Sequence, residues 1–225
     1  MKPKLVVFDI AGTTLNDRED TVSSAFLQAI QEQELTIGDN DIRWVMGYRK
    51  IEAIEMLLEA AGIAVSKEKI EQIHNRFIEI LNQHYRQATI REYDGISALF
   101  SELRQEGIRV ALDTGFSAAT TSVITDRLGW LRDGLVDAII SSDQVGQGRP
   151  HPDMIQALMQ QFHIQNPIDV AKVGDTPSDL LEGKNSGCGM TIGVTYGTHT
   201  REELEQHPHD HIVSSVDELK SLLLR

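Results

Sequence analysis

Cysteine is almost absent from this chain of 225 residues, and long apolar runs are missing altogether. Cys188 is its one cysteine, so an intrachain disulfide is excluded, and we expect an inert thiol in a cytoplasmic protein. No stretch approaches the roughly 20 apolar residues of a membrane span. Asp9 interrupts the apolar stretch near the N-terminus, which argues against a signal peptide. The sequence therefore predicts a soluble protein with no membrane partner.

Basic residues are scarce as well. The chain has 21 Lys and Arg against 34 Asp and Glu, and its formal net charge is −13. Such a surface repels phosphate backbones, so we expect no nucleic-acid partner. A small anionic substrate would need local cations or a metal ion. The length suits one domain with an insertion or two small domains, and the choice between a monomer and a homodimer stays open.

The apolar residues that are present form several short runs typical of buried strands. Their hydrophobicity is continuous rather than alternating, which indicates a parallel sheet covered on both faces. Helical patterns lie between them, so the sequence predicts an α/β fold with a Rossmann-like parallel sheet. The predicted strands are 4–10, 108–114, 135–143 and 170–176, with a weaker fifth at 190–197, and the predicted helices between them are 96–107, 153–162 and 178–187.

Residues 16–90 break this alternation. They contain helical patterns at 21–33, 50–62 and 69–87 and no convincing strand. The sequence therefore predicts an α/β core domain made of residues 1–15 and 91–225, with an all-helical insertion over residues 16–90.

Carboxylates collect where the predicted strands end. Ligands bind beyond the carboxyl ends of strands in such sheets, and clustered carboxylates that repel one another usually hold a hard cation such as Mg²⁺. One aspartate after a strand is more often a turn or N-cap residue, and Asp113 and Asp143 keep that interpretation. The joint pattern is more telling, and comprises Asp9 with "AGTT", Thr114, Arg149 in "GRPHPDM" and Asp175 and Asp179 in "GDTPSD".

These four motifs, in this order, resemble those of the haloacid dehalogenase superfamily over essentially the whole chain. The resemblance implies a helical cap of the C1 type, Mg²⁺, and Asp9 as a nucleophile that forms an aspartyl-phosphate. Thr114 and Arg149 would stabilise the transferring phosphoryl group, and Thr13 and Gly115 would contact the substrate. The metal ligands implied are Asp9, the carbonyl of Ala11, Asp175 and Asp179.

Ala11 stands where phosphatases of this superfamily usually carry a second aspartate, the general acid. Phosphonoacetaldehyde hydrolases (phosphonatases) resemble this chain in their "AGTT" loop and in an arginine like Arg149. Their cap lysine forms a Schiff base with the substrate aldehyde, and the segment from Met46 to Lys50 resembles theirs. The resemblance implies Lys50 as a catalytic residue and Met46 as a substrate contact, while Arg49 is the alternative cation of the cap.

The chain also departs from the phosphonatase pattern. Ala53 stands where a histidine is expected, Phe116 where a tyrosine is expected, and Glu19 lies near the place of an expected cysteine.

Taken alone, Lys50 would be an exposed lysine at a helix start. The cluster "HPHDH" at 207–211 is better explained as a polar surface connection than as a metal site.

Three functions therefore stay open. The first is a Mg²⁺-dependent, phosphonatase-like hydrolase acting on a small phosphonate or phosphate. The second is a phosphomonoesterase for a substrate such as phosphoglycolate or a sugar phosphate. The third is a catalytically silent binding module, against which the intact motif set argues. A dehalogenase is disfavoured because halide chemistry does not need the acidic metal motif.

Overall fold

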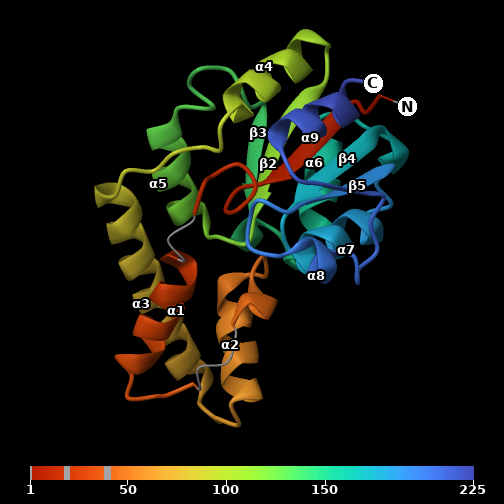
Figure 1. Cartoon of the computed structure of the whole chain (residues 1–225). Helices are drawn as coiled ribbons and strands as arrows, with labels where there is room; N and C mark the ends of the chain where they lie inside the picture. Colours follow the sequence, from red (N-terminus) through yellow and green to blue (C-terminus); the bar gives the residue numbers. More distant parts are fainter. Residues whose placement is uncertain (1, 18–20, 38–41) are drawn as a thin grey trace.

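A six-stranded parallel sheet forms the centre of the computed structural model, which describes residues 2–17, 21–37 and 42–225 (Figure 1). The strand order is β3-β2-β1-β4-β5-β6, so the first strand lies in the middle and Asp9 pairs in register with Asp113 of its neighbour. The strands are β1 Leu5–Asp9, β2 Arg109–Thr114, β3 Ala138–Ser141, β4 Val170–Gly174, β5 Met190–Val194 and β6 His211–Val213. This confirms the predicted α/β fold.

Helices cover both faces of the sheet because the strands are apolar on both. Successive side chains of a strand point to opposite faces, and β1 shows this directly. Val6 and Phe8 belong to the larger apolar cluster, whereas Leu5 and Val7 belong to a second cluster on the other side of the sheet. The helices of this core are α4 Ile96–Gln105, α5 Ala118–Leu128, α6 Asp153–Gln161, α7 Pro177–Asn185, α8 Arg201–Leu204 and α9 Val216–Leu223.

Two features of the sheet differ from the sequence prediction. The sixth strand, β6, was not predicted, because three residues that follow a polar loop give too little pattern to recognise. The third strand ends at Ser141 rather than at residue 143, so Asp143 lies in a short 3₁₀ turn, Ser142–Gln144. Its carboxylate accepts hydrogen bonds from the backbone N–H of Ala118, at 3.0 and 3.1 Å, which is the capping role expected for it.

Three of the helices that lie between the first two strands form a group beside the sheet (Figure 1). They are α1 Thr21–Gln31, α2 Lys50–Ala60 and α3 Lys67–Gln87, and they are called the helical insertion below. Phe26 stacks on Phe77 with ring centroids 4.4 Å apart, which joins α1 to α3. The insertion thus has apolar packing of its own.

The chain enters and leaves the insertion along paired segments. The Asn16 N–H donates to the carbonyl of Arg91 at 2.9 Å, and the Tyr93 N–H donates to the carbonyl of Thr14 at 3.0 Å. Helix α3 also packs against α5 of the core, where Arg127 donates to the carbonyl of Ala88 at 2.7 Å. These contacts place the carboxyl edge of the sheet next to the insertion.

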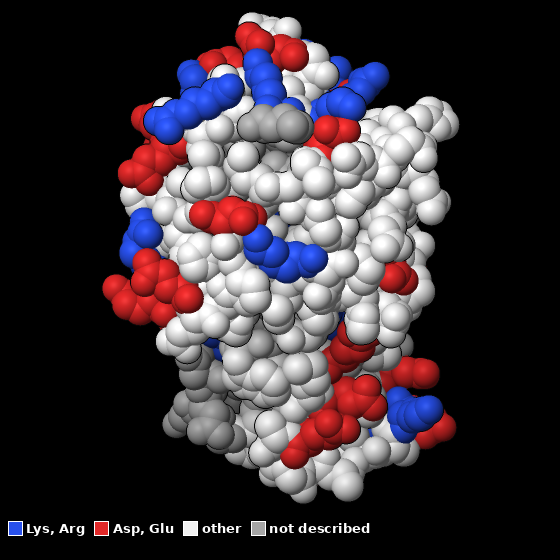
Figure 2. Space-filling model, turned by 90° about the vertical axis from the view of Figure 1, so that its right-hand side faces the viewer, with Lys and Arg blue, Asp and Glu red and all other residues white. Residues whose placement is uncertain are grey.

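The surface carries charge of both signs. On the face drawn in Figure 2, Lys and Arg side chains lie among Asp and Glu side chains rather than in one continuous basic area. In the part of the chain that the structure describes, no helix combines the length and the apolar character that a membrane crossing requires.

Candidate active site

Asp9 ends the central strand β1 and is 4% exposed. The turn after it is tight because Gly12 has a φ of +89°, a conformation that favours glycine. A Cβ at Gly12 would also overlap the carboxylate of Asp175. The hydroxyl of Thr13 donates to Asp175 at 2.9 Å. The "AGTT" loop therefore holds Asp9 and Asp175 close together.

Three buried carboxylates meet at this edge of the sheet. Oxygens of Asp9, Asp175 and Asp179 all lie within 4.8 Å of one another. Burial raises the pKa of Asp9 to about 8; Arg149 opposes the rise, and Asp179 and Asp175 add to it. Burial, followed by repulsion from Asp179, raises the pKa of Asp175 to about 6. Without a bound cation, the site therefore disfavours the simultaneous ionisation of these three carboxylates.

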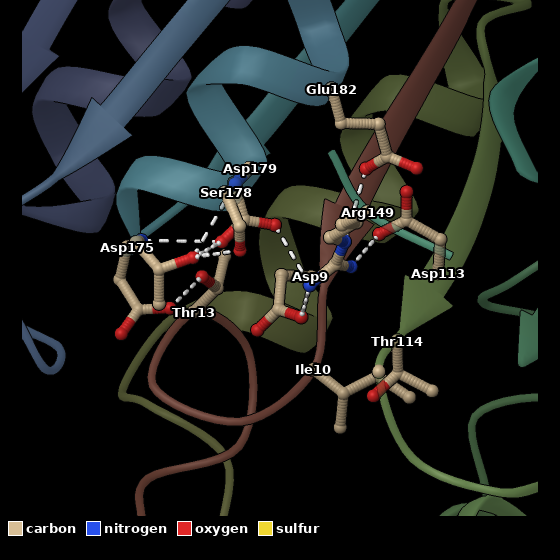
Figure 3. A network of polar contacts seen from close by, with 12 residues as sticks. Asp9, Ile10, Thr13, Asp113, Thr114, Arg149, Asp175, Ser178, Asp179 and Glu182 are labelled. Atoms are coloured by element: carbon tan, nitrogen blue, oxygen red, sulfur yellow. Dashed lines mark hydrogen bonds and ion pairs between the residues drawn. The ribbon is translucent and has the colours of Figure 1, made fainter. Parts of the chain in front are cut away.

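Arg149 lies behind Asp9 and is fully buried (Figure 3). One guanidinium nitrogen donates to Asp9 at 2.6 Å and forms an ion pair with Asp179 at 2.9 Å. Its Nε donates to Glu182 at 3.0 Å, and its remaining nitrogen donates to Asp113. Arg149 does not line the pocket described below. Its direct partners are therefore Asp9 and the neighbouring carboxylates.

Lys172 was not singled out from the sequence. It lies in the middle of β4 with no exposed surface. Its ammonium group pairs with Asp113, with Glu182 at 3.0 Å and with Asp179 at 3.1 Å. A lysine inside an otherwise apolar strand ("VAKVG") was the available signal, since charged residues are almost never fully buried unless paired.

Asp113 corrects the sequence interpretation. It was expected to be a turn or capping residue, but its side chain is fully buried between Arg149 and Lys172. Burial alone would raise its pKa, and these two cations outweigh that effect and hold the pKa below its ordinary value. Burial, followed by Asp113, raises the pKa of Glu182 to about 8.

The donor set fits a divalent metal. Five buried carboxylates face three buried cations, Arg149, Lys172 and Lys50, which leaves 3 − 5 = −2 if all are ionised; the carboxylates are Asp9, Asp113, Asp175, Asp179 and Glu182. All the candidate ligands are hard oxygens, as Mg²⁺ prefers. Asp179 also has a structural role, because its carboxylate completes a capping box with Thr176 at the start of α7.

A small pocket opens on the other side of Asp9, between the core and the helical insertion. Its volume is about 50 Å³, room for a few water-sized groups. The insertion supplies Met46, Gly47 and Lys50, and the core supplies Ala11, Thr114 and Gly115. Asp17, which the sequence analysis did not single out, also lines it.

Lys50 is buried in this pocket, 5% exposed, rather than being an exposed lysine at a helix start. Its amine lies 5.7 Å from the ring centre of Phe26 and 5.2 Å from that of Phe116. Burial lowers its pKa to about 8; Asp9 opposes this shift and Arg149 adds to it. The structure therefore brings Lys50 to Asp9 as predicted, with an amine that is easier to deprotonate than an ordinary lysine.

The structure does not place two predicted substrate contacts in the pocket lining. Arg49 turns away and donates to carbonyls of the loop after β3: to Ser142, to Val145 at 2.9 Å and to Gly146 at 3.2 Å. Thr13 uses its hydroxyl on Asp175, as described above. Glu19 falls outside the described residues.

Neither Cys188 nor the histidine cluster at 207–211 is part of the described pocket lining. Cys188 is buried, and burial raises the pKa of its thiol to about 12, which fits an inert side chain. His207–Asp210 lie in the loop before β6, and His211 begins that strand. In the described ranges, neither group of possible metal ligands includes these histidines.

Comparisons with known proteins identify the family of this chain. The family model of haloacid dehalogenase-like hydrolases matches residues 6–193. A phosphonoacetaldehyde hydrolase of Bacillus cereus (strain AH187) is 29% identical over 211 residues, covering 88% of this chain and 78% of that protein. Both results rest on sequence and span most of the chain.

Solved structures show the same fold. A phosphonoacetaldehyde hydrolase-like protein from Oleispira antarctica superposes with a TM-score of 0.87 at 20% identity, covering 100% of this chain and 92% of that one. A predicted phosphoglycolate phosphatase from Haemophilus somnus superposes with a TM-score of 0.77 at 19% identity, covering 99% of both chains. Because the family model spans most of its length, the chain belongs to the haloacid dehalogenase-like hydrolase family.

Proposed function

We propose that this hydrolase cleaves the carbon–phosphorus bond of a small phosphonate aldehyde of the phosphonoacetaldehyde type. The observation that carries the proposal is the buried amine of Lys50, which lines the same pocket as Asp9. A phosphomonoesterase has no evident need for a buried amine with a lowered pKa. An amine that is partly neutral is what imine formation with an aldehyde requires.

Ala11 supports the same proposal. It lies in the pocket lining, and its methyl group transfers no proton. General acid–base catalysis typically contributes about 10²- to 10⁴-fold to rate, so an ester substrate would react with a handicap. A leaving group that departs as an enamine from a Lys50 imine does not need that acid.

The proposed reaction proceeds in two stages. Lys50 first forms an iminium with the aldehyde. A carboxylate oxygen of Asp9 then attacks phosphorus, the carbon–phosphorus bond breaks, and its electron pair moves into the iminium to give an enamine. Water afterwards hydrolyses the aspartyl-phosphate, and the enamine is protonated and hydrolysed to the free aldehyde. Thr114, which lines the pocket, would donate to the phosphoryl oxygens, and Arg149 would hold the carboxylate of Asp9.

Mg²⁺ is part of the proposal. Asp9, Asp175 and Asp179 would hold it, with the carbonyl of Ala11, and it would neutralise the phosphoryl charge that Asp9 must approach. Helices α1–α3, within predicted residues 16–90, would act as a cap that excludes water from the pocket. The cytoplasmic location, the homodimer and the lack of nucleic-acid and membrane partners remain predictions from the sequence.

A phosphomonoesterase for a small acid such as phosphoglycolate is the second candidate. Two positions favour it, because Ala53 and Phe116 replace the histidine and tyrosine expected beside a phosphonatase lysine. The pocket of about 50 Å³ suits a two-carbon substrate better than a sugar phosphate. A binding module without catalysis is disfavoured by the complete set Asp9, Asp175 and Asp179.

Phosphate release with Mg²⁺ from phosphonoacetaldehyde, phosphoglycolate and glucose 6-phosphate tests the proposal. We expect turnover of phosphonoacetaldehyde and, with borohydride, a reduced adduct on Lys50 found by peptide mass mapping. Lys50→Arg should abolish both. Lys67→Arg is the matched control, because Lys67 also begins a helix but is exposed. Preferred turnover of phosphoglycolate, unchanged in Lys50→Arg, would establish the second candidate instead.

A further inference from the structure

The described lining of the pocket contains three ionisable side chains: Asp9, Asp17 and Lys50. The proposed function uses Asp9 as the nucleophile and Lys50 as the amine, and it leaves Asp17 without a role. Imine formation nevertheless needs a group that carries protons, and Ala11 carries none. Asp17 is therefore the remaining ionisable side chain of the described lining that could carry these protons.

Asp17 lies where the chain leaves the core. The N–H of the preceding residue, Asn16, is fixed to the carbonyl of Arg91 at 2.9 Å. Asp17 borders the pocket of Asp9 and also a second cavity of about 330 Å³, which is lined by Tyr85 and Arg91. This position between a small pocket and a wider cavity suits a group that exchanges protons with solvent.

The carboxylate of Asp17 influences the pKa values of two neighbouring side chains, Lys50 and Tyr85. It opposes the lowering of the Lys50 pKa, and its effect is smaller than those of burial, Asp9 and Arg149. Burial raises the pKa of the Tyr85 hydroxyl well above its usual range, and Asp17 is the next cause of that rise. Asp17 thus lies near both the amine and a buried hydroxyl, whereas the rings of Phe26 and Phe116 beside the amine carry no proton to transfer.

We infer that Asp17 is the proton carrier for the imine chemistry of Lys50. The inference rests on the proposed function. In imine formation the Lys50 nitrogen forms a bond to the aldehyde carbon and the carbon–oxygen bond breaks. The neutral amine, the aldehyde and the protonated Asp17 carboxyl give the iminium, one water molecule and the Asp17 carboxylate.

The same carboxylate then serves the reverse step. After bond cleavage the enamine takes up a proton from solvent at its terminal carbon and becomes an iminium again. When water attacks this iminium, Asp17 accepts a proton from that water. The Lys50 amine, the free aldehyde and the protonated carboxyl are then restored. Asp17 therefore contacts the oxygen that leaves and the water that enters, and it makes no contact with the phosphoryl group.

Asp17→Asn tests this inference because asparagine keeps the shape and removes the acid. We expect borohydride trapping on Lys50 with phosphonoacetaldehyde, measured in a single turnover, to slow by about 10²- to 10⁴-fold, and kcat to fall in parallel. KM should stay within about twofold, because Asp17 does not bind the phosphoryl group. Asp17→Glu should restore part of the trapping rate.

The folded state and the metal site are checked in the same proteins. The melting temperature and its rise with Mg²⁺ should match the wild type, and Asp94→Asn, which removes an exposed aspartate, should trap at the wild-type rate. Wild-type trapping with an unchanged rate in Asp17→Asn would overturn the inference alone. No trapping on Lys50 in the wild-type protein would overturn the proposed function and this inference together.

Discussion

The two walls of the pocket are built on different physical principles. The wall behind Asp9 is a closed charge network in which Arg149 and Lys172 share the carboxylates of Asp113, Asp179 and Glu182, all without exposed surface. The facing wall carries Lys50 between aromatic rings, and the loop around it is held by hydrogen bonds to backbone carbonyls.

The two walls therefore have different roles: the core wall supports the chemical step, and the insertion wall influences substrate selectivity. Breaking a buried ion pair costs about 3–5 kcal/mol because it leaves an uncompensated charge, so the network on the core side tolerates little change. Contacts to carbonyls near the surface can be lost at a smaller cost. We therefore expect changes in the core wall to abolish activity or stability, and changes in the insertion wall to alter which substrate reacts and how tightly it binds.

The largest expected effect is on the core side, at Asp9. Asp9→Asn should lower kcat by more than about 10⁴-fold, since the amide is not a nucleophile. The fold should persist, because the amide oxygen of asparagine can still accept from Arg149, which keeps its pairs with Asp113, Asp179 and Glu182. Phosphate release and circular dichroism measure both results. Turnover near the wild-type rate would mean that Asp9 is not the nucleophile.

The next effect separates the network from the nucleophile. Lys172→Met should lower the free energy of unfolding by about 3–5 kcal/mol and the melting temperature by about 10 °C. The double variant Lys172→Met with Glu182→Gln removes one charge of each sign and should recover part of that loss. Calorimetry compares the two, and equal stability of Lys172→Met and the wild type would contradict the role given to the network.

Magnesium should stabilise the core wall. Binding relieves the repulsion of Asp9, Asp175 and Asp179, and a ligand at 100 times its Kd contributes about 2.7 kcal/mol. We expect the melting temperature to rise by about 5–10 °C, and Asp175→Asn should lose most of this rise. If saturating Mg²⁺ left the melting temperature of the wild-type protein unchanged, the proposed metal site would be wrong.

The pH dependence of imine trapping tests the insertion wall. With a pKa of about 8, the neutral fraction of Lys50 should rise about 50-fold from pH 6 to pH 8 and then at most about twofold. An ordinary lysine would instead keep gaining neutral amine up to about pH 10.4. Trapping in metal-free protein with cyanoborohydride measures the curve, and continued steep growth above pH 8 would show that burial does not shift Lys50.

The smallest effect is expected at Arg49. Arg49→Ala removes hydrogen bonds to Val145 and Gly146, each worth about 1 kcal/mol, and should raise KM by about five- to tenfold while kcat changes little. Arg76→Ala is the matched control, since Arg76 pairs with Glu32 on the outside of the insertion. Equal KM values for the two variants would show that Arg49 does not hold the insertion against the core.

The sequence predicted the core wall in outline and the insertion wall less well. Strand ends and motifs were enough to locate Asp9, Asp175 and Asp179, because parallel strands bring their carboxyl ends to one edge. Lys172 was missed, because strand patterns are judged by apolar residues and one lysine does not disturb them. Arg49 and Lys50 are adjacent and chemically alike, and the packing of α2 against the core decides which of them faces the pocket.

Two further differences have equally local causes. Asp17 stands in the charged run "LNDRED", which looks like an ordinary solvated loop until the return of the chain at Arg91 fixes its place. Asp143 was placed at a strand end because the apolar run continues to residue 140, but ladder pairing stops where Thr114 meets Ser141. Pairing partners far apart in the sequence determine such limits, and a local pattern does not contain them.

Gly115 has a kinetic consequence. A Cβ at this position would overlap the carbonyl oxygens of Tyr48 and Gly47, so the residue after strand β2 lies directly against the backbone of the insertion. Backbone cannot change rotamer to admit a molecule, and this contact therefore either holds or separates. If the insertion opens to admit a substrate, this contact must separate, and the frequency of opening is then an upper limit on turnover.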